Sequence, residues 1–76
     1  MTYTTIKMKF EMRGDYGNVS CVYNISPCVY SQAKEYAERV LDQCFSKGYF
    51  FRSPVPEGTQ IAYPASTIQN VAIEYL

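Results

Sequence analysis

The stretch YTTIKMKFEM, residues 3–12, predicts a β-strand with one buried and one exposed face. Every second residue from Ile6 to Met12 is apolar, and the residues that alternate with them are polar: Thr5, Lys7, Lys9 and Glu11. Successive side chains of a strand point to opposite faces of a sheet. We therefore expect the apolar set in the core and the lysines in water.

A second strand is predicted directly after a turn. The segment RGDYGN, residues 13–18, contains two glycines, an aspartate and an asparagine, which favour tight turns. The alternation of apolar and polar residues then resumes over residues 19–25. Two such runs across a short turn predict an antiparallel hairpin. Because proline cannot donate a hydrogen bond to a sheet, we expect Ser26 and Pro27 to end the second strand.

The next segment, residues 31–47, predicts the helix of the fold. Its start is open between Ser26, which precedes a proline, and Ser31. We favour Ser31 as the cap, because QAKEYAERVLDQCFSK has better helix propensity than PCVY. Lys47 and Gly48 suit a helix C-terminus. The apolar stripe that should pack on the sheet is Ala33, Ala37, Val40, Leu41 and Cys44.

Three short extended segments complete the chain: residues 49–52, 60–63 and 70–75. The loop SPVPEGT, residues 53–59, separates the first two, and PASTI, residues 64–68, forms a turn before the third. The order ββαβββ predicts a single α+β domain over residues 1–76, with one helix packed on one face of a mostly antiparallel sheet. The order of the strands stays open. The residues expected in the core are Ile6, Met8, Phe10, Cys21, Tyr23, Ala37, Val40, Leu41, Cys44, Ile61, Val71 and Ile73.

Charge and composition narrow the function classes. Seven basic and seven acidic residues cancel, so the surface offers no broad positive field for duplex DNA or a membrane. No apolar run is long enough to span a bilayer, and the alternating N-terminal segment is unlike a signal peptide. Cys21, Cys28 and Cys44 occur without any histidine or CxxC spacing. This pattern indicates reduced thiols in the cytoplasm rather than disulfides or a zinc site.

The sequence carries no constellation typical of an enzyme. Without histidine, the commonest acid–base group near neutral pH is missing. The GxSxG, P-loop and GxGxxG patterns do not occur. Cys28 is the best candidate nucleophile, although an inert thiol explains it better. We expect a protein that is not an enzyme and that uses no metal or other cofactor.

The run KGYFFR, residues 47–52, places three aromatic rings in succession. In a strand, Phe50 can face the helix while Tyr49 and Phe51 point the other way. Three arrangements remain open for the outer rings. The strand can be central, so that its neighbours partly shelter these rings, or its register can differ, so that Tyr49 packs at the helix end. In the third arrangement, Tyr49, Phe51 and Arg52 are exposed on the uncovered sheet face or at its rim. Tyrosine and arginine are enriched in binding hot spots, so exposure would indicate a binding surface. The residues expected to bind a partner are Tyr49, Phe51 and Arg52, followed by Tyr3, Lys7 and Lys9.

These observations favour a non-catalytic protein-binding module, such as a small inhibitor or regulator of a larger protein. Small size and the lack of catalytic motifs are also typical of accessory proteins of phages and mobile elements, including anti-CRISPR inhibitors. The partner is another protein or a second copy, which could pair along NVAIEYL, residues 70–76. One alternative is single-stranded nucleic-acid binding, in which the aromatic side chains stack bases beside the lysines of the first strand. A homodimeric structural protein is the other alternative.

Overall fold

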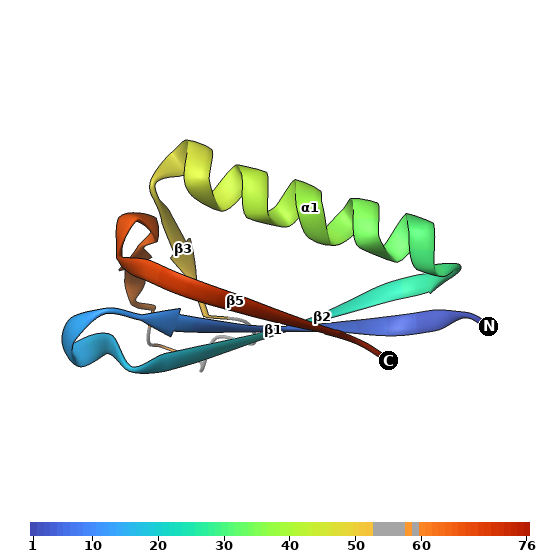
Figure 1. The fold of residues 1–76 in the computed structure, drawn as a ribbon, viewed down its shortest axis with the longest axis horizontal. Coiled ribbons are helices and arrows are strands. Elements are labelled where there is room, and N and C mark those ends of the chain that lie inside the picture. The colour runs from blue at the N-terminus through green and yellow to red at the C-terminus, as the bar shows by residue number, and fades with distance from the viewer. Residues whose placement is uncertain (53–57, 59) are drawn as a thin grey trace.

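The computed structural model describes residues 1–52, 58 and 60–76, so the predicted loop over residues 53–59 lies, except for Gly58, outside the described residues. Within these ranges, five strands and one helix follow in the predicted order ββαβββ (Figure 1). They are β1 (Tyr3–Met12), β2 (Asn18–Cys28), α1 (Tyr30–Lys47), β3 (Tyr49–Phe51), β4 (Ala62–Pro64) and β5 (Ile68–Tyr75). The predicted α+β class is therefore confirmed.

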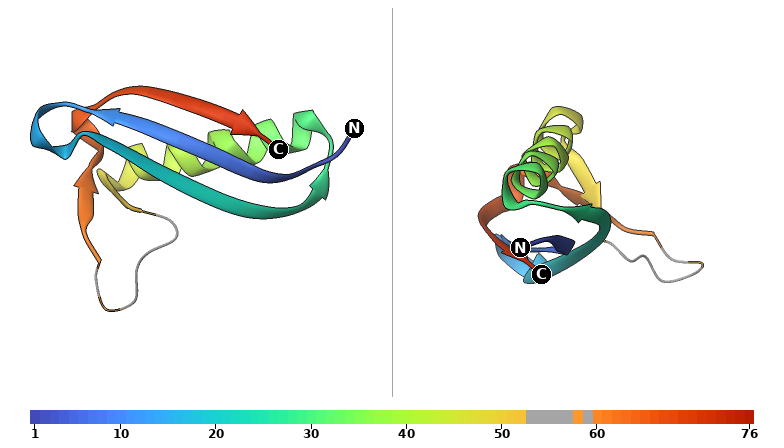
Figure 2. Two further views of the ribbon diagram at one scale, coloured as in Figure 1. Left: turned by 90° about the horizontal axis from the view of Figure 1, so that it is seen from below. Right: turned by 90° about the vertical axis from the view of Figure 1, so that its right-hand side faces the viewer.

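The strands form two antiparallel sheets rather than one. β1 is the central strand of the larger sheet, with β2 on one side and β5 on the other. β3 and β4 form a separate pair of three residues each. Figure 2 shows α1 along one face of the larger sheet, which we call the inner face. The described part of the chain leaves the opposite, outer face uncovered.

The core lies between α1 and the inner face of the larger sheet. Ile6, Met8 and Phe10 of β1 are fully buried, as the alternation of the sequence predicts. On the helix, Ala33 and Ala37 are fully buried as well, and their small side chains let the helix approach the sheet closely. The rest of the predicted helical stripe packs against the same cluster: Val40, Leu41 and Cys44. The predicted packing faces of strand and helix are thus confirmed.

Glycines with positive φ angles reverse the chain in the predicted hairpin turn and at the predicted end of the helix. In the hairpin turn, Gly14 and Gly17 have φ angles of 72° and 67°. At the end of α1, Gly48 has a φ angle of 84°, and its N–H donates a hydrogen bond of 3.0 Å to the Cys44 carbonyl oxygen. Glycine adopts this conformation without the steric cost that a Cβ atom brings.

The junction between β2 and α1 differs from the prediction. Ser26 and Pro27 do not end the strand, because β2 continues to Cys28. Proline is tolerated there because β2 is an edge strand. The helix then begins at Tyr30, and the preceding Val29 carbonyl accepts its first hydrogen bonds, from the N–H groups of residues 32 and 33. The predicted serine caps are therefore wrong.

Irregular pairing near the same junction affects the direction of Tyr3. Thr5 lies opposite Asn24, whereas Tyr3 lies opposite Cys28, so β2 carries extra residues over this interval. On the other side of β1, the N–H groups of Thr4 and Thr5 both donate to the Leu76 carbonyl oxygen, at 2.7 and 3.0 Å, so β1 carries an extra residue opposite Leu76. This bulge breaks the alternation of β1, and Tyr3 packs against the core.

The predicted core is correct except for Ile61, whose side chain is 56% exposed. Ile61 precedes β4, which belongs to the small sheet, and it therefore gains no shelter from the larger one. The buried set also includes residues outside the predicted list: Met12, Val19, Ala33, Phe50 and Ala65.

Candidate functional site

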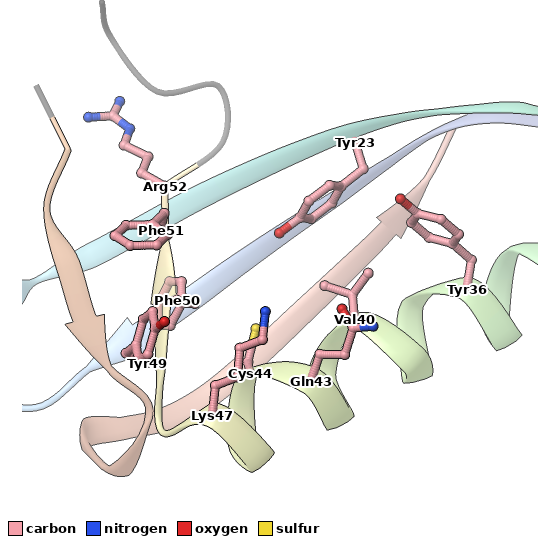
Figure 3. Close-up of a pocket in the computed structure, with 10 residues that line it drawn as sticks. All are labelled: Tyr23, Tyr36, Val40, Gln43, Cys44, Lys47, Tyr49, Phe50, Phe51 and Arg52. Atoms are coloured by element: carbon pink, nitrogen blue, oxygen red, sulfur yellow. The ribbon is translucent and has the colours of Figure 1, made fainter. Parts of the chain in front are cut away.

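A groove of about 380 Å³ lies between the C-terminal half of α1, β2 and β3 (Figure 3). Aromatic rings and cationic side chains from all three elements line it. The aromatic and cationic lining residues that are not buried are Tyr23, Tyr36, Lys47, Tyr49, Phe51 and Arg52. We call this surface the aromatic groove.

Burial of one ring in β3 determines where its neighbours point. Phe50 is 5% exposed, and its ring lies 4.5 Å from that of Phe10 and stacks at 5.5 Å on that of Tyr63. Because side chains alternate along a strand, Tyr49 and Phe51 turn to the opposite side. They are 43% and 37% exposed, and their rings meet edge to face at 5.5 Å. The predicted alternation within YFFR is therefore confirmed.

Two further contacts hold β3 against the rest of the fold. The Cys21 thiol of β2 donates a hydrogen bond of 3.8 Å to the Phe51 carbonyl oxygen. The Gly48 carbonyl oxygen, just before β3, accepts a hydrogen bond of 2.9 Å from the N–H of Ala65. The ring pair of β3 is thus presented from a strand that is attached at both ends.

The groove combines neutral hydroxyl and thiol groups with two cations. Burial raises the pKa of Tyr23, and the neighbouring Cys21 adds to the rise. Burial also raises the pKa of the Cys44 thiol, with a smaller opposing effect from Lys47. Both groups are therefore neutral at physiological pH, and Lys47 and Arg52 are the basic side chains of the groove. The ion pair seen among the described residues, Glu35–Arg39 at 3.8 Å, involves neither of these two cations.

The structure separates the six residues that the sequence suggests for binding. Tyr49, Phe51 and Arg52 line the aromatic groove together. Lys7 and Lys9 lie on the outer face, in a shallow hollow of about 490 Å³ whose other side chains are small, apolar or acidic. The expectation that lysines and aromatic rings share one surface is wrong, because β3 joins a separate sheet on the helix side.

Tyr3, the sixth predicted binding residue, lies in a third place. Its ring is 6.3 Å from that of Tyr30 and 6.2 Å from that of Tyr75. These rings meet at the N-terminal end of α1, where the bulge at Thr4 and Thr5 turns Tyr3 inward. Tyr3 therefore belongs to a packing cluster, apart from both the groove and the lysines.

Sequence reasoning missed the helical wall of the groove. Tyr36, Gln43 and Lys47 line it from α1, together with Val40 of the core stripe. Successive members of this set are four, three and four residues apart, so they follow one stripe that adjoins the core stripe and shares Val40 with it. The signal was therefore present in the sequence, although only the structure shows that β3 lies opposite this stripe.

The described residues show no arrangement for metal-dependent chemistry. Nowhere in residues 1–52, 58 and 60–76 do three His, Cys, Asp or Glu side chains gather so as to hold a metal ion. The same ranges contain no helix long and apolar enough to cross a membrane. Cys21, Cys28 and Cys44 form no disulfide with one another.

No protein-family model, curated protein or solved structure matches this chain. The function must therefore be inferred from the geometry of the chain itself. The aromatic groove brings together three of the six residues that the sequence suggests, and the aromatic and cationic side chains that it adds from β2 and α1 are Tyr23, Tyr36 and Lys47.

Proposed function

We propose that this protein acts by binding another protein through the aromatic groove, without catalysing a reaction. The observation that carries the proposal is the exposed Tyr49–Phe51 ring pair, held at 5.5 Å and flanked by Lys47 and Arg52. Aromatic and arginine side chains are the ones most enriched at the energetic centres of protein interfaces. Rings fixed by a buried neighbour also lose little conformational entropy on binding.

The groove chemistry suggests the kind of segment that would fit. The rings offer apolar contact area, and the two cations offer charge-assisted hydrogen bonds to carboxylates. A peptide segment with an apolar side chain next to an acidic one satisfies both. Such a small, non-catalytic binder would act as an inhibitor or regulator of a larger protein, as phage and mobile-element accessory proteins do. The cytoplasm is the location we propose, because three thiols suit a reducing compartment.

Affinity capture from a lysate of the native host, with matched variants as bait, tests the proposal. Phe51→Ala removes a groove ring, whereas Phe45→Ala removes an exposed phenylalanine of α1 that does not line the groove. A partner that binds the wild type and Phe45→Ala, but is lost with Phe51→Ala, supports the groove. A partner that all three baits retain equally contradicts it.

Nuclease treatment of the captured material separates this function from the nucleic-acid alternative. A protein that stays bound after the treatment supports direct protein binding. If all binding disappears, the protein-binding proposal fails. Replacing Arg52 by Gln should weaken a partner with an acidic segment, because the substitution removes one of the two groove charges.

A further inference from the structure

The outer edge of β5 presents unpaired backbone groups in a fixed pattern. Thr5 and Leu76 exchange two hydrogen bonds, N–H to carbonyl oxygen, at 3.0 and 2.9 Å. In an antiparallel pair, such hydrogen-bonded positions alternate along the strand. The N–H and C=O groups of Val71, Ile73 and Tyr75 therefore point away from β1. None of the hydrogen bonds shown for the described residues engages these outward groups.

The two edges of the larger sheet are protected very differently. The outer edge of β2 contains Pro27 and a register shift, both of which hinder the addition of another strand. β5 contains no proline between Val71 and Tyr75, and its pairing with β1 is regular there. Figure 2 shows no other described element beside this edge of β5. A regular, unprotected edge is a template for pairing with another strand.

We propose that two copies of the protein pair through β5, antiparallel and with the twofold axis at Ile73. To form hydrogen bonds, residues whose backbone groups point away from β1 must lie opposite such residues of the partner subunit. Because these are every second residue of β5, the twofold axis must pass through a residue of β5 and not between two residues. An axis at Ile73 pairs Val71 with Tyr75 of the partner subunit and Ile73 with Ile73 of the partner subunit. Each of these hydrogen-bonded pairs exchanges two bonds, so the seam gains about six. An axis at Glu74 would instead place two like charges opposite each other.

Charges on the outer face complement each other in this register. Within one protomer Lys7 lies beside Glu74, and Lys9 lies beside Ala72. Across the seam, Glu74 then faces Ala72 of the partner subunit, whose small side chain leaves Lys9 of the partner subunit within reach. Each Glu74 is thus flanked by a lysine from both chains. An axis at Ala72 would bring the two Ala72 residues together and leave Glu74 beside Asn70 of the partner subunit.

This dimer leaves the aromatic groove accessible. β5 and β2 are opposite edges of the larger sheet, and the groove lies on the β2 side. The proposed dimer and the proposed binding function therefore occupy separate surfaces. A dimer would carry two grooves, which raises the effective affinity for a partner that has two binding segments. Either proposal can fail without the other, because solution mass tests the first and partner capture tests the second.

Sedimentation equilibrium of the wild type over a dilution series, with two charge variants at Ala72, tests the dimer. Ala72→Glu places a carboxylate opposite Glu74 of the partner subunit in two symmetric pairs. We expect the dissociation constant of the dimer to rise about 2- to 30-fold. Ala72→Lys reverses the sign at the same positions and should tighten the dimer by a similar factor. Ala72 is exposed, so both variants should fold.

Stability of the isolated fold provides an internal check on these variants. Position 72 lies beside Lys9 of the same chain, so Ala72→Glu should stabilise the protomer and Ala72→Lys should destabilise it. The expected effects on dimer affinity are the reverse: Ala72→Glu weakens the dimer and Ala72→Lys strengthens it. Damage to the fold would not produce this opposition. Ser20→Glu is the matched control, because it adds a carboxylate beside Lys9 from the β2 side, away from the seam. It should leave the dissociation constant unchanged.

Three results would overturn the proposal. A wild type that stays monomeric at the highest concentration rules out the dimer. Weakening by both Ala72 variants rules out the axis at Ile73, since it shows that Ala72 faces its own copy. An equal effect of Ser20→Glu and Ala72→Glu shows that general charge, and not the β5 seam, controls association.

Discussion

The β1–β2 hairpin and the β3–β4 pair are both antiparallel, but they differ in length and in how much of each is buried. In β1 as in β3, buried side chains alternate with exposed ones. The hairpin strands span 10 and 11 residues, and the inner face of β1 is buried from Ile6 to Met12. The β3 and β4 strands span three residues each, and Phe50 is the buried residue of β3.

The difference shows that strand length decides what a β-pair can do in so small a fold. A long pair covers enough area to bury a whole face against the helix. A short pair cannot bury a face of its own, but one anchoring ring suffices to attach it to a larger core. Its remaining side chains then stay exposed in a defined orientation. The hairpin is the scaffold, and the β3–β4 pair presents the rings of the groove.

The largest effect should come from breaking the scaffold. Phe10→Ala removes a fully buried ring of β1 that contacts both the inner core and Phe50. We expect a loss of about 4–5 kcal/mol in the free energy of unfolding, which approaches the whole stability of a domain of this size. Urea denaturation followed by circular dichroism measures it. A loss below about 1 kcal/mol would show that the hairpin does not form the core.

Removal of the anchoring ring should have the next largest effect. Phe50→Ala should cost about 3 kcal/mol, less than Phe10→Ala because the site lies at the edge of the core and can relax. Hydrogen exchange should distinguish the two variants. In Phe50→Ala, faster exchange should concentrate in residues 49–51 and 62–64, while β1 stays protected. Uniform loss of protection would show that the two regions unfold as one unit.

The link between helix and groove should respond more weakly. Gly48→Ala forces a Cβ atom into a φ angle of 84°, although no heavy atom lies within 4 Å of the new methyl group. The cost is then purely conformational, about 1–2 kcal/mol. Gly48→Asn should cost less, because asparagine tolerates the left-handed conformation better. Thermal or urea unfolding of both variants measures the difference, and equal costs would argue against backbone strain as the cause.

The smallest effect should come from the exposed rings. Phe51→Ala should lower the stability by about 1 kcal/mol or less, because the residue is already 37% exposed. Phe45→Ala on α1 is the matched control, because Phe45 is 54% exposed. This substitution should lower the stability by less, since it removes no ring contact like the one between Phe51 and Tyr49. If Phe51→Ala destabilised the protein as much as Phe50→Ala, the groove ring would belong to the core.

Local patterns were sufficient to predict the scaffold but not the placement of the short strands. The alternation in β1 and the stripe on α1 each lie within one element, so their periods could be read directly. Pairing of β3 with β4 depends on contacts between distant parts of the chain, and three residues carry too little pattern to choose a neighbour. The exposure of Ile61 was missed for the same reason.

The candidate site was predictable in part. The alternation around Phe50 was correct because it follows from strand geometry alone. The grouping of Tyr3 with Lys7 and Lys9 failed because a bulge in β1, which alternation cannot reveal, turns Tyr3 toward the core. Tyr36 and Lys47 share a helical stripe that is visible in the sequence, but their role depends on β3 lying across from them.

The central position of β1 also has a consequence for how the chain folds during synthesis. One of its two neighbours, β5, follows only after about 55 intervening residues. At the usual rate of translation, one edge of β1 stays without its partner for roughly 3–11 s after β1 itself is complete. During that interval the nascent chain exposes the backbone groups of this edge. Chaperones that bind exposed strand edges would therefore act on this protein chiefly before β5 emerges.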